Sequence, residues 1–117
     1  MSYRASVDGY IVLSHGFDDT RRDFILNTLI GIDDELAVNI CNDTVEIGYE
    51  SIRPRFDEDK WINALNAITP YTLKGELYFI GEDNTEWKYK TSVNDRNRLI
   101  WENYDAVTEY RYSGLLF

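Results

Sequence analysis

Apolar and polar residues alternate most regularly over residues 74–89, in two runs separated by a short polar segment. Such alternation is typical of β-strands with one buried face, and the Gly-Glu-Asp-Asn segment at 81–84 contains the residue types that a chain reversal needs. The pattern therefore predicts a β-hairpin. Its apolar face would carry Gly75, Leu77, Phe79, Trp87 and Tyr89.

The amino-terminal part predicts one strand followed by one helix. The strand lies within residues 3–14, where the continuous apolar run at 10–13 indicates a central strand covered on both faces. The helix follows the cap-type residues Asp18 and Asp19, runs to residue 30 and stops at Gly31. Its apolar residues at near-helical spacing are Phe24, Ile25, Leu29 and Ile32.

A second hairpin and a second helix come next. Residues 36–41 and 45–50 alternate on either side of Asn42 and Asp43, which predicts a tight hairpin. The acidic residues at 57–59 favour the amino end of a helix, and Pro70 ends it. The apolar side of this helix would carry Trp61, Ala64, Leu65 and Ile68. From residue 72 onward the pattern predicts strands alone, at 73–80, 85–93, 98–104 and 106–112.

The order of these elements predicts the fold class. The order β-α-β-β-α-β, with right-handed crossovers, gives a ferredoxin-like α+β fold in which both helices cover one face of a mostly antiparallel sheet. The last strands would extend it as a carboxy-terminal β-meander. With 117 residues the chain forms a single domain, 1–117. We expect the core to contain Phe24, Ile25, Leu29, Trp61, Leu65 and Ile68 packed against Val12, Val38, Ile47, Leu77 and Phe79.

Two helices on one face leave the other face of the sheet open unless a partner or the meander covers it. The candidates for this open face are Tyr78, Ile80, Ile100, Tyr104, Tyr110 and Tyr112. Tyrosines suit a protein-binding surface, and the apolar end of the chain could join them. The predicted binding residues are therefore Tyr78, Tyr104, Tyr110, Tyr112 and Phe117. Two alternatives stay open: the tyrosines could be ordinary strand residues with hydroxyls in water, and the tail could fold back onto the core.

The charge of the chain narrows the classes of partner. It has 21 acidic and 12 basic residues, a net charge of -9 and a pI near 4.4. Such a field repels phosphate backbones, which disfavours direct nucleic-acid binding and favours a protein partner with a basic surface. The alternative is that the acidity serves solubility alone.

Cysteine content and hydropathy bear on location. The single cysteine, Cys41, excludes an internal disulfide, and the amino-terminal residues lead into no apolar run of signal-peptide length. No stretch approaches the roughly 20 apolar residues that span a bilayer. We therefore expect a cytoplasmic protein that does not bind membranes. Its oligomeric state stays open.

Candidate chemistry is sparse. Ser14 adjoins His15, the single histidine, but strand neighbours point to opposite faces, which argues against a catalytic pair. Cys41 lacks the local positive field that would make it a nucleophile. The acidic clusters at 18–19, 33–35 and 57–59 are placed as helix caps or loop residues and lack the ligand pattern of a calcium site. No catalytic residue, metal or cofactor is predicted.

Two segments bear on the family. Residues 2–11 read Ser-Tyr-Arg-Ala-Ser-Val-Asp-Gly-Tyr-Ile, and residues 74–83 read Lys-Gly-Glu-Leu-Tyr-Phe-Ile-Gly-Glu-Asp before Trp-Lys-Tyr at 87–89. In both segments the chain resembles small uncharacterised proteins of bacterial phages and mobile elements. In those proteins a Tyr-Arg start leads to a first strand, and a Gly-Glu-Asp turn leads to a Trp-containing strand. The resemblance implies a setting in which small acidic proteins bind and block a host protein, as many anti-CRISPR and anti-restriction proteins do.

Two hypotheses from different classes follow. The first is a non-enzymatic protein-interaction module, an anti-CRISPR-like or anti-restriction-like inhibitor of a host nucleic-acid-binding or defence protein. The second is a small-ligand-binding protein or minor enzyme with a pocket between sheet and helices near His15. Carboxylates along one continuous face at phosphate-like spacing would favour the first through mimicry, and a closed pocket containing His15 would favour the second.

Overall fold

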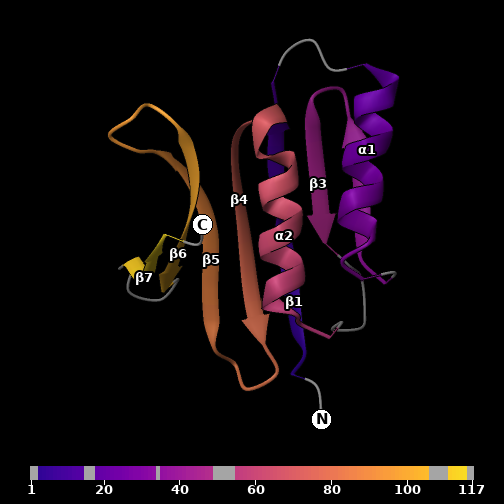
Figure 1. The fold of residues 1–117 in the computed structure, drawn as a ribbon. Coiled ribbons are helices and arrows are strands. Elements are labelled where there is room, and N and C mark those ends of the chain that lie inside the picture. Colours follow the sequence, from indigo (N-terminus) through magenta and orange to yellow (C-terminus); the bar gives the residue numbers. More distant parts are fainter. Residues whose placement is uncertain (1–2, 15–17, 34, 49–54, 106–110, 116–117) are drawn as a thin grey trace.

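Two helices and one antiparallel sheet make up the chain in the computed structural model, which describes residues 3–14, 18–33, 35–48, 55–105 and 111–115. In order, the elements are β1 (Ala5–Leu13), α1 (Asp19–Ile30), β2 (Ala37–Cys41), β3 (Thr44–Gly48), α2 (Glu58–Ile68), a 3-10 turn (Thr69–Tyr71), β4 (Thr72–Gly81), β5 (Glu86–Val93), β6 (Leu99–Asp105) and β7 (Arg111–Leu115). The described strands form one sheet in the order β2-β3-β1-β4-β5-β6-β7, with antiparallel neighbours. Both helices lie on one face of it (Figure 1). The predicted mixed α+β class is confirmed.

Each helix begins at an aspartate that caps it, as predicted. The Asp18 carboxylate accepts a hydrogen bond from the Arg21 N–H at 2.9 Å, and the Asp57 carboxylate accepts one from the Lys60 N–H at 3.3 Å. These bonds satisfy backbone donors that the first turn of a helix leaves unpaired. The negative charge also interacts favourably with the positive end of the helix dipole. These two acidic clusters thus have a structural role.

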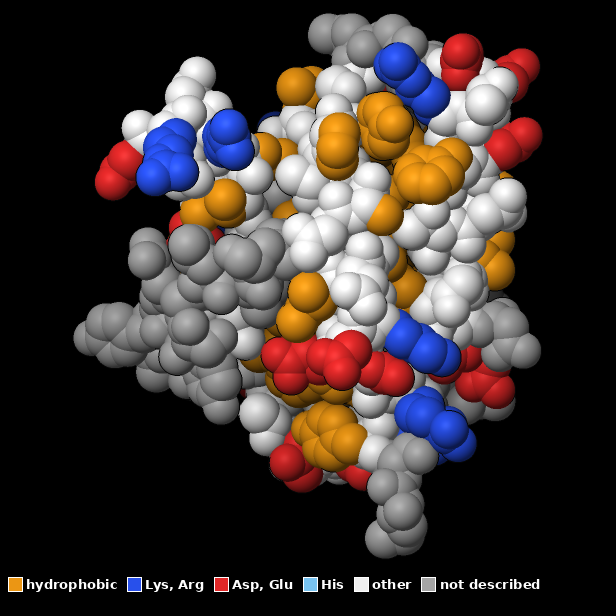
Figure 2. Space-filling view, in the orientation of Figure 1, with side chains coloured by type: hydrophobic (Ala, Val, Ile, Leu, Met, Phe, Trp, Pro, Cys, Tyr) orange, Lys and Arg blue, Asp and Glu red, His pale blue; other side chains and the backbone are white. Residues whose placement is uncertain are grey.

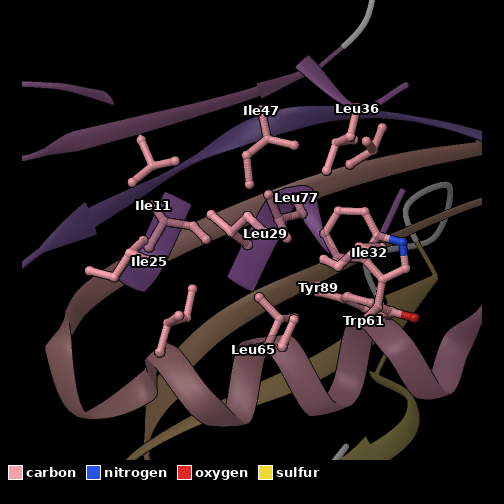
Figure 3. Packing of buried hydrophobic residues seen from close by; sticks show 14 of the residues in the cluster. Ile11, Ile25, Leu29, Ile32, Leu36, Ile47, Trp61, Leu65, Leu77 and Tyr89 are labelled. Carbon is pink, nitrogen blue, oxygen red and sulfur yellow. The ribbon is translucent and has the colours of Figure 1, made fainter. Parts of the chain in front are cut away.

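The core lies between the helices and the sheet (Figure 3). The helices contribute residues four apart, Ile25 with Leu29 and Trp61 with Leu65, which lie on one helix face. The sheet contributes alternate residues of its strands. Its fully buried members are Ile11, Leu13, Val45, Leu77, Phe79, Tyr89 and Trp101. The aromatic face of the 74–89 hairpin is as predicted, because Phe79 pairs with Trp87 and Leu77 with Tyr89.

Two residues expected in the core lie elsewhere. Phe24 is 46% exposed, because Ile25 and Leu29 define the inward face of α1 and Phe24 lies beside that face. Its ring contacts Tyr71 edge to face at 6.1 Å. Val12 is half-buried and points away from the helices, because the alternation of β1 sends Ile11 and Leu13 into the core.

β1 is central in the sheet, between β3 and β4, as its apolar run predicts. The further prediction that both faces of this strand are covered is wrong for its middle. Ile11 is fully buried, whereas its neighbour Tyr10 is 38% exposed on the face opposite the helices. A tyrosine tolerates this position because its ring packs on the sheet while its hydroxyl reaches water.

The carboxy-terminal strands differ from the predicted ranges. The last strand was expected at 106–112, but β7 spans Arg111–Leu115, and residues 106–110 lie outside the described part. Leu115, the first residue of the apolar chain end, pairs with Glu102 of β6. Residues 116–117 lie outside the described part.

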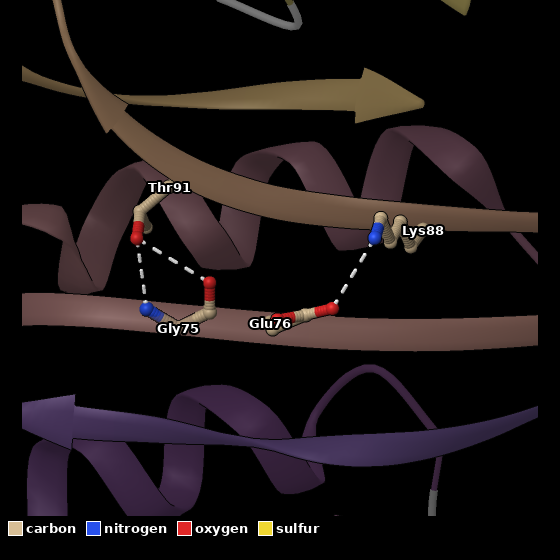
Figure 4. A network of polar contacts seen from close by, with 4 residues as sticks. All are labelled: Gly75, Glu76, Lys88 and Thr91. Carbon is tan, nitrogen blue, oxygen red and sulfur yellow. Dashed lines mark hydrogen bonds and ion pairs between the residues drawn. The ribbon is translucent and has the colours of Figure 1, made fainter. Parts of the chain in front are cut away.

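Gly75 of β4 lies against the ring of Trp101 in β6. A Cβ at Gly75 would lie 2.7 Å from Cη2 of Trp101 and 3.1 Å from the Tyr10 carbonyl oxygen, so the Trp101 ring occupies the space that a side chain would need. Thr91 Oγ1 accepts a hydrogen bond from the Gly75 N–H at 2.9 Å and donates one to the Gly75 carbonyl at 3.3 Å (Figure 4). The threonine thus links β4 and β5 beyond the last residue pair of their ladder.

Candidate functional site

The face of the sheet opposite the helices carries two of the predicted binding residues, Tyr78 and Tyr104, and we call it the helix-free face. It is defined by the residues that alternate with the core residues on β1 to β6: Asp8, Tyr10, Val12, Asn39, Glu46, Lys74, Glu76, Tyr78, Ile80, Glu86, Lys88, Lys90, Ser92, Ile100, Glu102 and Tyr104. Most of these side chains are charged, polar or tyrosine. Neither helix packs on this face (Figure 1).

Tyr78, Lys88 and Tyr104 form a row across three strands. Lys88 of β5 pairs with Tyr78 of β4 on one side and with Tyr104 of β6 on the other. Both rings are half-buried, and both hydroxyls are engaged: Tyr78 donates to the carboxylate of Glu86, and Tyr104 donates to Glu102 at 3.3 Å. Because each ring is fixed at both ends, the row presents aromatic surface in a defined position.

Ionic contacts and hydrogen bonds of buried charged side chains on the same face restrict the positions of these residues. Lys88 is 9% exposed, and its Nζ lies 3.5 Å from Oε1 of Glu76 (Figure 4). Glu102 is 3% exposed and also accepts a hydrogen bond from the Ser92 hydroxyl. Buried ionic groups persist only when they are paired or hydrogen-bonded, since desolvation otherwise destabilises them. Their positions are therefore restricted, and so are those of the tyrosines that they contact.

The side of this face nearer β2 is acidic. A shallow hollow of about 390 Å³ is lined by Asp8, Ala37, Val38, Asn39, Glu46, Ile47 and Gly48. Asp8 and Glu46 are exposed, and the described residues that line the hollow include no lysine or arginine. Tyr10 pairs with Glu46 across β1 and β3, so an exposed aromatic ring borders the hollow. Two carboxylates beside a tyrosine ring suit a cationic group.

The helix side of the molecule has a different charge pattern. A hollow of about 560 Å³ between the end of α1 and the start of α2 is lined by Arg4, Ile30, Gly31, Ile32, Asp33, Glu35, Arg55, Asp57 and Lys60. Figure 2 shows a group of adjoining acidic side chains in the lower part of this side, with basic side chains beside it. The carboxylates of this side are therefore accompanied by basic groups.

Two tyrosines outside the row have raised pKa values. Burial raises the pKa of Tyr89, and the Glu58 carboxylate raises it further. Partial desolvation raises the pKa of Tyr3, whose hydroxyl donates to Asp83, and this hydrogen bond lowers the pKa of the Asp83 carboxyl. Desolvation and the neighbouring carboxylates thus favour the neutral phenol at both positions.

The remaining chemical groups show no catalytic arrangement within the described residues. In that part of the chain no group of three or more His, Cys, Asp or Glu side chains is placed to hold a metal ion. Cys41 is exposed. His15 lies outside the described residues, so the pocket hypothesis built on it stays a hypothesis.

The structure brings together two of the five predicted binding residues, Tyr78 and Tyr104. Tyr112 lies in β7, and its side chain is outside the described part, as are Tyr110 and Phe117. Sequence reasoning missed Tyr10, because the apolar run at 10–13 suggested a strand covered on both faces. The alternation of Asp8, Tyr10 and Val12 with Val7, Ile11 and Leu13 could have identified it.

Comparison with known proteins found no matching family model, no matching curated protein and no matching solved structure. Among the described residues, no helix is both long and apolar enough to cross a membrane. The function is therefore argued from the residues of the helix-free face.

Proposed function

We propose that this chain is a non-enzymatic protein-interaction module that binds a partner with a basic surface through its helix-free face. In the setting that its resemblance to phage and mobile-element proteins implies, it would inhibit a host nucleic-acid-binding or defence protein. The observation that carries the proposal is the row of Tyr78, Lys88 and Tyr104, which is held in place on a face that neither helix covers.

Restrained aromatic rings are efficient binding residues. A tyrosine buries a large area on binding and loses little conformational freedom, particularly when its position is already set. Tyr78 and Tyr104 have hydrogen-bonded hydroxyls, so little further ordering is required of them. Tyr10 adds a third ring on the same face, two strands from Lys88.

Charge supports a basic partner. The net charge of -9 would attract such a partner over a distance, and the exposed carboxylates of Asp8 and Glu46 would meet it beside Tyr10. A surface that normally holds nucleic acid is basic, which is why the proposal names that class of partner.

We also propose that the fold is ferredoxin-like with a carboxy-terminal β-meander. The strand order β4-β1-β3-β2 within the sheet supports the first part, because it matches the order of two split β-α-β units packed together. The consecutive neighbours β5, β6 and β7 support the second part. This arrangement leaves the helix-free face open to a partner.

The test compares exposed aromatic residues on opposite faces. A tagged chain captures candidate partners from a lysate of its native organism, and each candidate is purified and titrated by calorimetry. Tyr10→Ala and Tyr78→Ala should weaken binding about fivefold or more, since loss of an aromatic anchor costs over about 1 kcal/mol. Phe24→Ala is the matched control, because Phe24 is similarly exposed on the helix side.

The melting temperature of each variant is measured as well and must equal that of the natural chain, so that a loss of binding does not reflect a loss of folding. The proposal is contradicted if Phe24→Ala abolishes binding while the two tyrosine variants bind as the natural chain does. A captured small molecule that binds without any protein partner would instead favour the ligand-binding hypothesis.

A further inference from the structure

β2 is an edge strand of unusual composition for such a position. Residues Ala37–Cys41 read Ala-Val-Asn-Ile-Cys, with no charged residue and no proline, in a chain of which 28% is charged. Its pairing with β3 is continuous from Ala37 to Cys41, without a bulge. Natural sheets commonly protect their edges with charges, prolines or bulges, because an unprotected edge pairs with other strands. β2 has none of these features.

The hairpin register shows which backbone groups face outward. Asn42 and Asp43 separate Cys41 from Thr44, so these two form the hydrogen-bonded pair that closes a two-residue turn. Pairs alternate along an antiparallel ladder, and the backbone groups of Val38 and Ile40 therefore point away from β3. The outward set is two N–H and two C=O groups.

One contact within the described residues already uses this edge. Nη2 of Arg22 in α1 donates a hydrogen bond to the Ile40 carbonyl at 2.8 Å. No other described residue bonds the outward groups of Val38 and Ile40. That contact also establishes independently that the Ile40 carbonyl faces outward.

We propose that β2 is the docking edge for an extended basic segment of the partner, which adds to the sheet as a further strand. This inference rests on the proposed function and identifies the binding mode. Backbone hydrogen bonds to Val38 and Ile40 would align the segment, and its alternate side chains would lie over the helix-free face.

Charge complementarity identifies the occupant as basic. Strands are spaced about 4.8 Å apart, so Glu46 of β3 would lie about 10 Å from the added strand, within the combined reach of an arginine and a glutamate side chain. The path crosses β2 at Ala37 and Asn39, which are small. The arginine would end in the hollow that Asp8 and Glu46 line, where no other described lining residue is a cation.

A second copy of the chain is the less suitable occupant. Each copy carries a net charge of -9, and Glu35, Asp43 and Glu46 flank β2, so pairing of two β2 strands would bring like charges together. A basic segment turns the same charges into attraction.

The test uses two capped hexapeptides as probes, one of alternating arginine and valine and one of alternating glutamate and valine. Each is titrated into isotope-labelled chain, and amide shifts and hydrogen exchange are followed by NMR. The arginine peptide should bind with a Kd of about 1 mM or tighter. It should slow exchange of the Val38 and Ile40 amides at least fivefold and bind at least tenfold more tightly than the glutamate peptide. N-methylation of alternate residues of the arginine peptide should abolish binding, because it removes donors from the new ladder.

Matched variants separate the contributions. Asp8→Asn with Glu46→Gln should weaken arginine-peptide binding at least fivefold. Glu82→Gln with Asp95→Asn removes the same charge at exposed positions outside the hollow and should change it less than twofold. Arg22→Ala should strengthen binding more than Arg21→Ala does, because Arg22 alone of the two occupies the Ile40 carbonyl.

The assignment of β2 is overturned if no peptide binds at millimolar concentration or if both peptides bind equally. It is also overturned if sedimentation detects a dimer without peptide and this dimer protects Val38 and Ile40. If the arginine peptide shifts Tyr78 and Tyr104 but leaves β2 unaffected, the edge inference fails while the helix-free face stays the proposed binding surface.

Discussion

Gly75→Ala perturbs the packing of β4 against the Trp101 ring of β6. The added methyl carbon would lie 2.7 Å from Cη2 of Trp101, 3.1 Å from the Tyr10 carbonyl oxygen and 3.3 Å from Cγ1 of Ile11. Trp101 is fully buried, so its ring cannot move into water to relieve the overlap. Overpacking of this kind costs about 1–3 kcal/mol, against a gain of up to about 1 kcal/mol from the lower flexibility of alanine in the unfolded chain.

The expected net loss of unfolding free energy is about 1–2 kcal/mol, which corresponds to a fall in Tm of about 3–10 °C for a domain of this size. Urea unfolding followed by circular dichroism measures it. The same substitution in a Trp101→Leu background should cost at least about 1 kcal/mol less, because the smaller side chain removes the overlap with the ring while the contacts with the Tyr10 carbonyl and Ile11 stay. A coupling of at least about 1 kcal/mol between the two sites is therefore expected. Equal cost in both backgrounds would show that Trp101 does not fill the space above Gly75.

Three further predictions concern the core, alkaline stability and charge. Trp61→Ala should cost about 3–5 kcal/mol while Phe24→Ala costs under about 1 kcal/mol, because Trp61 is buried and Phe24 is exposed; urea unfolding of both variants checks this. Because the pKa of Tyr89 is raised in the folded chain, the free energy of unfolding keeps its full value with respect to this group below about pH 10. Above that pH the tyrosine of the unfolded chain ionises, and the free energy of unfolding falls by up to about 1.4 kcal/mol per pH unit. Tyr89→Phe should reduce that alkaline loss, and an equal loss in both proteins would refute the assignment. Association with a basic partner should slow as salt rises from about 0.05 to 0.5 M in stopped-flow measurements, and a salt-independent rate would argue against electrostatic steering.

The sequence predicts those parts of the fold that depend on interactions between residues close together in the chain. Asp18 and Asp57 cap their helices, because a carboxylate before an apolar periodic segment satisfies free N–H groups wherever the helix lies. The 74–89 hairpin has the predicted aromatic face, because the length of its turn sets the register that pairs Phe79 with Trp87.

The misses come from features that the sequence shows weakly. Phe24 and Ile25 are adjacent apolar residues, and only the crossing of α1 over the sheet decides which is buried. Tyr10 was assigned to a covered strand because an apolar run cannot reveal which face stays open. The expected last strand is displaced towards the end of the chain, since its pairing depends on contacts with β6 distant in sequence.

The candidate site was predictable only in part. Tyr78 and Tyr104 were expected on the open face, and strand alternation alone is sufficient to place them there. The burial of Lys88 between them could not be predicted, because a lysine in a strand normally faces water. Burial of this kind depends on the curvature of the sheet and on a partner such as Glu76, and neither can be seen in a run of residues.

The central claim is that the helix-free face binds the partner. It is tested most directly by placing a photo-reactive phenylalanine analogue at position 10 or at position 24 and irradiating cells of the native organism that express each variant. Both positions carry exposed aromatic residues, on opposite faces of the molecule. The account predicts a discrete cross-linked protein with a basic surface at position 10 and none at position 24. A cross-link at position 24 alone would contradict it.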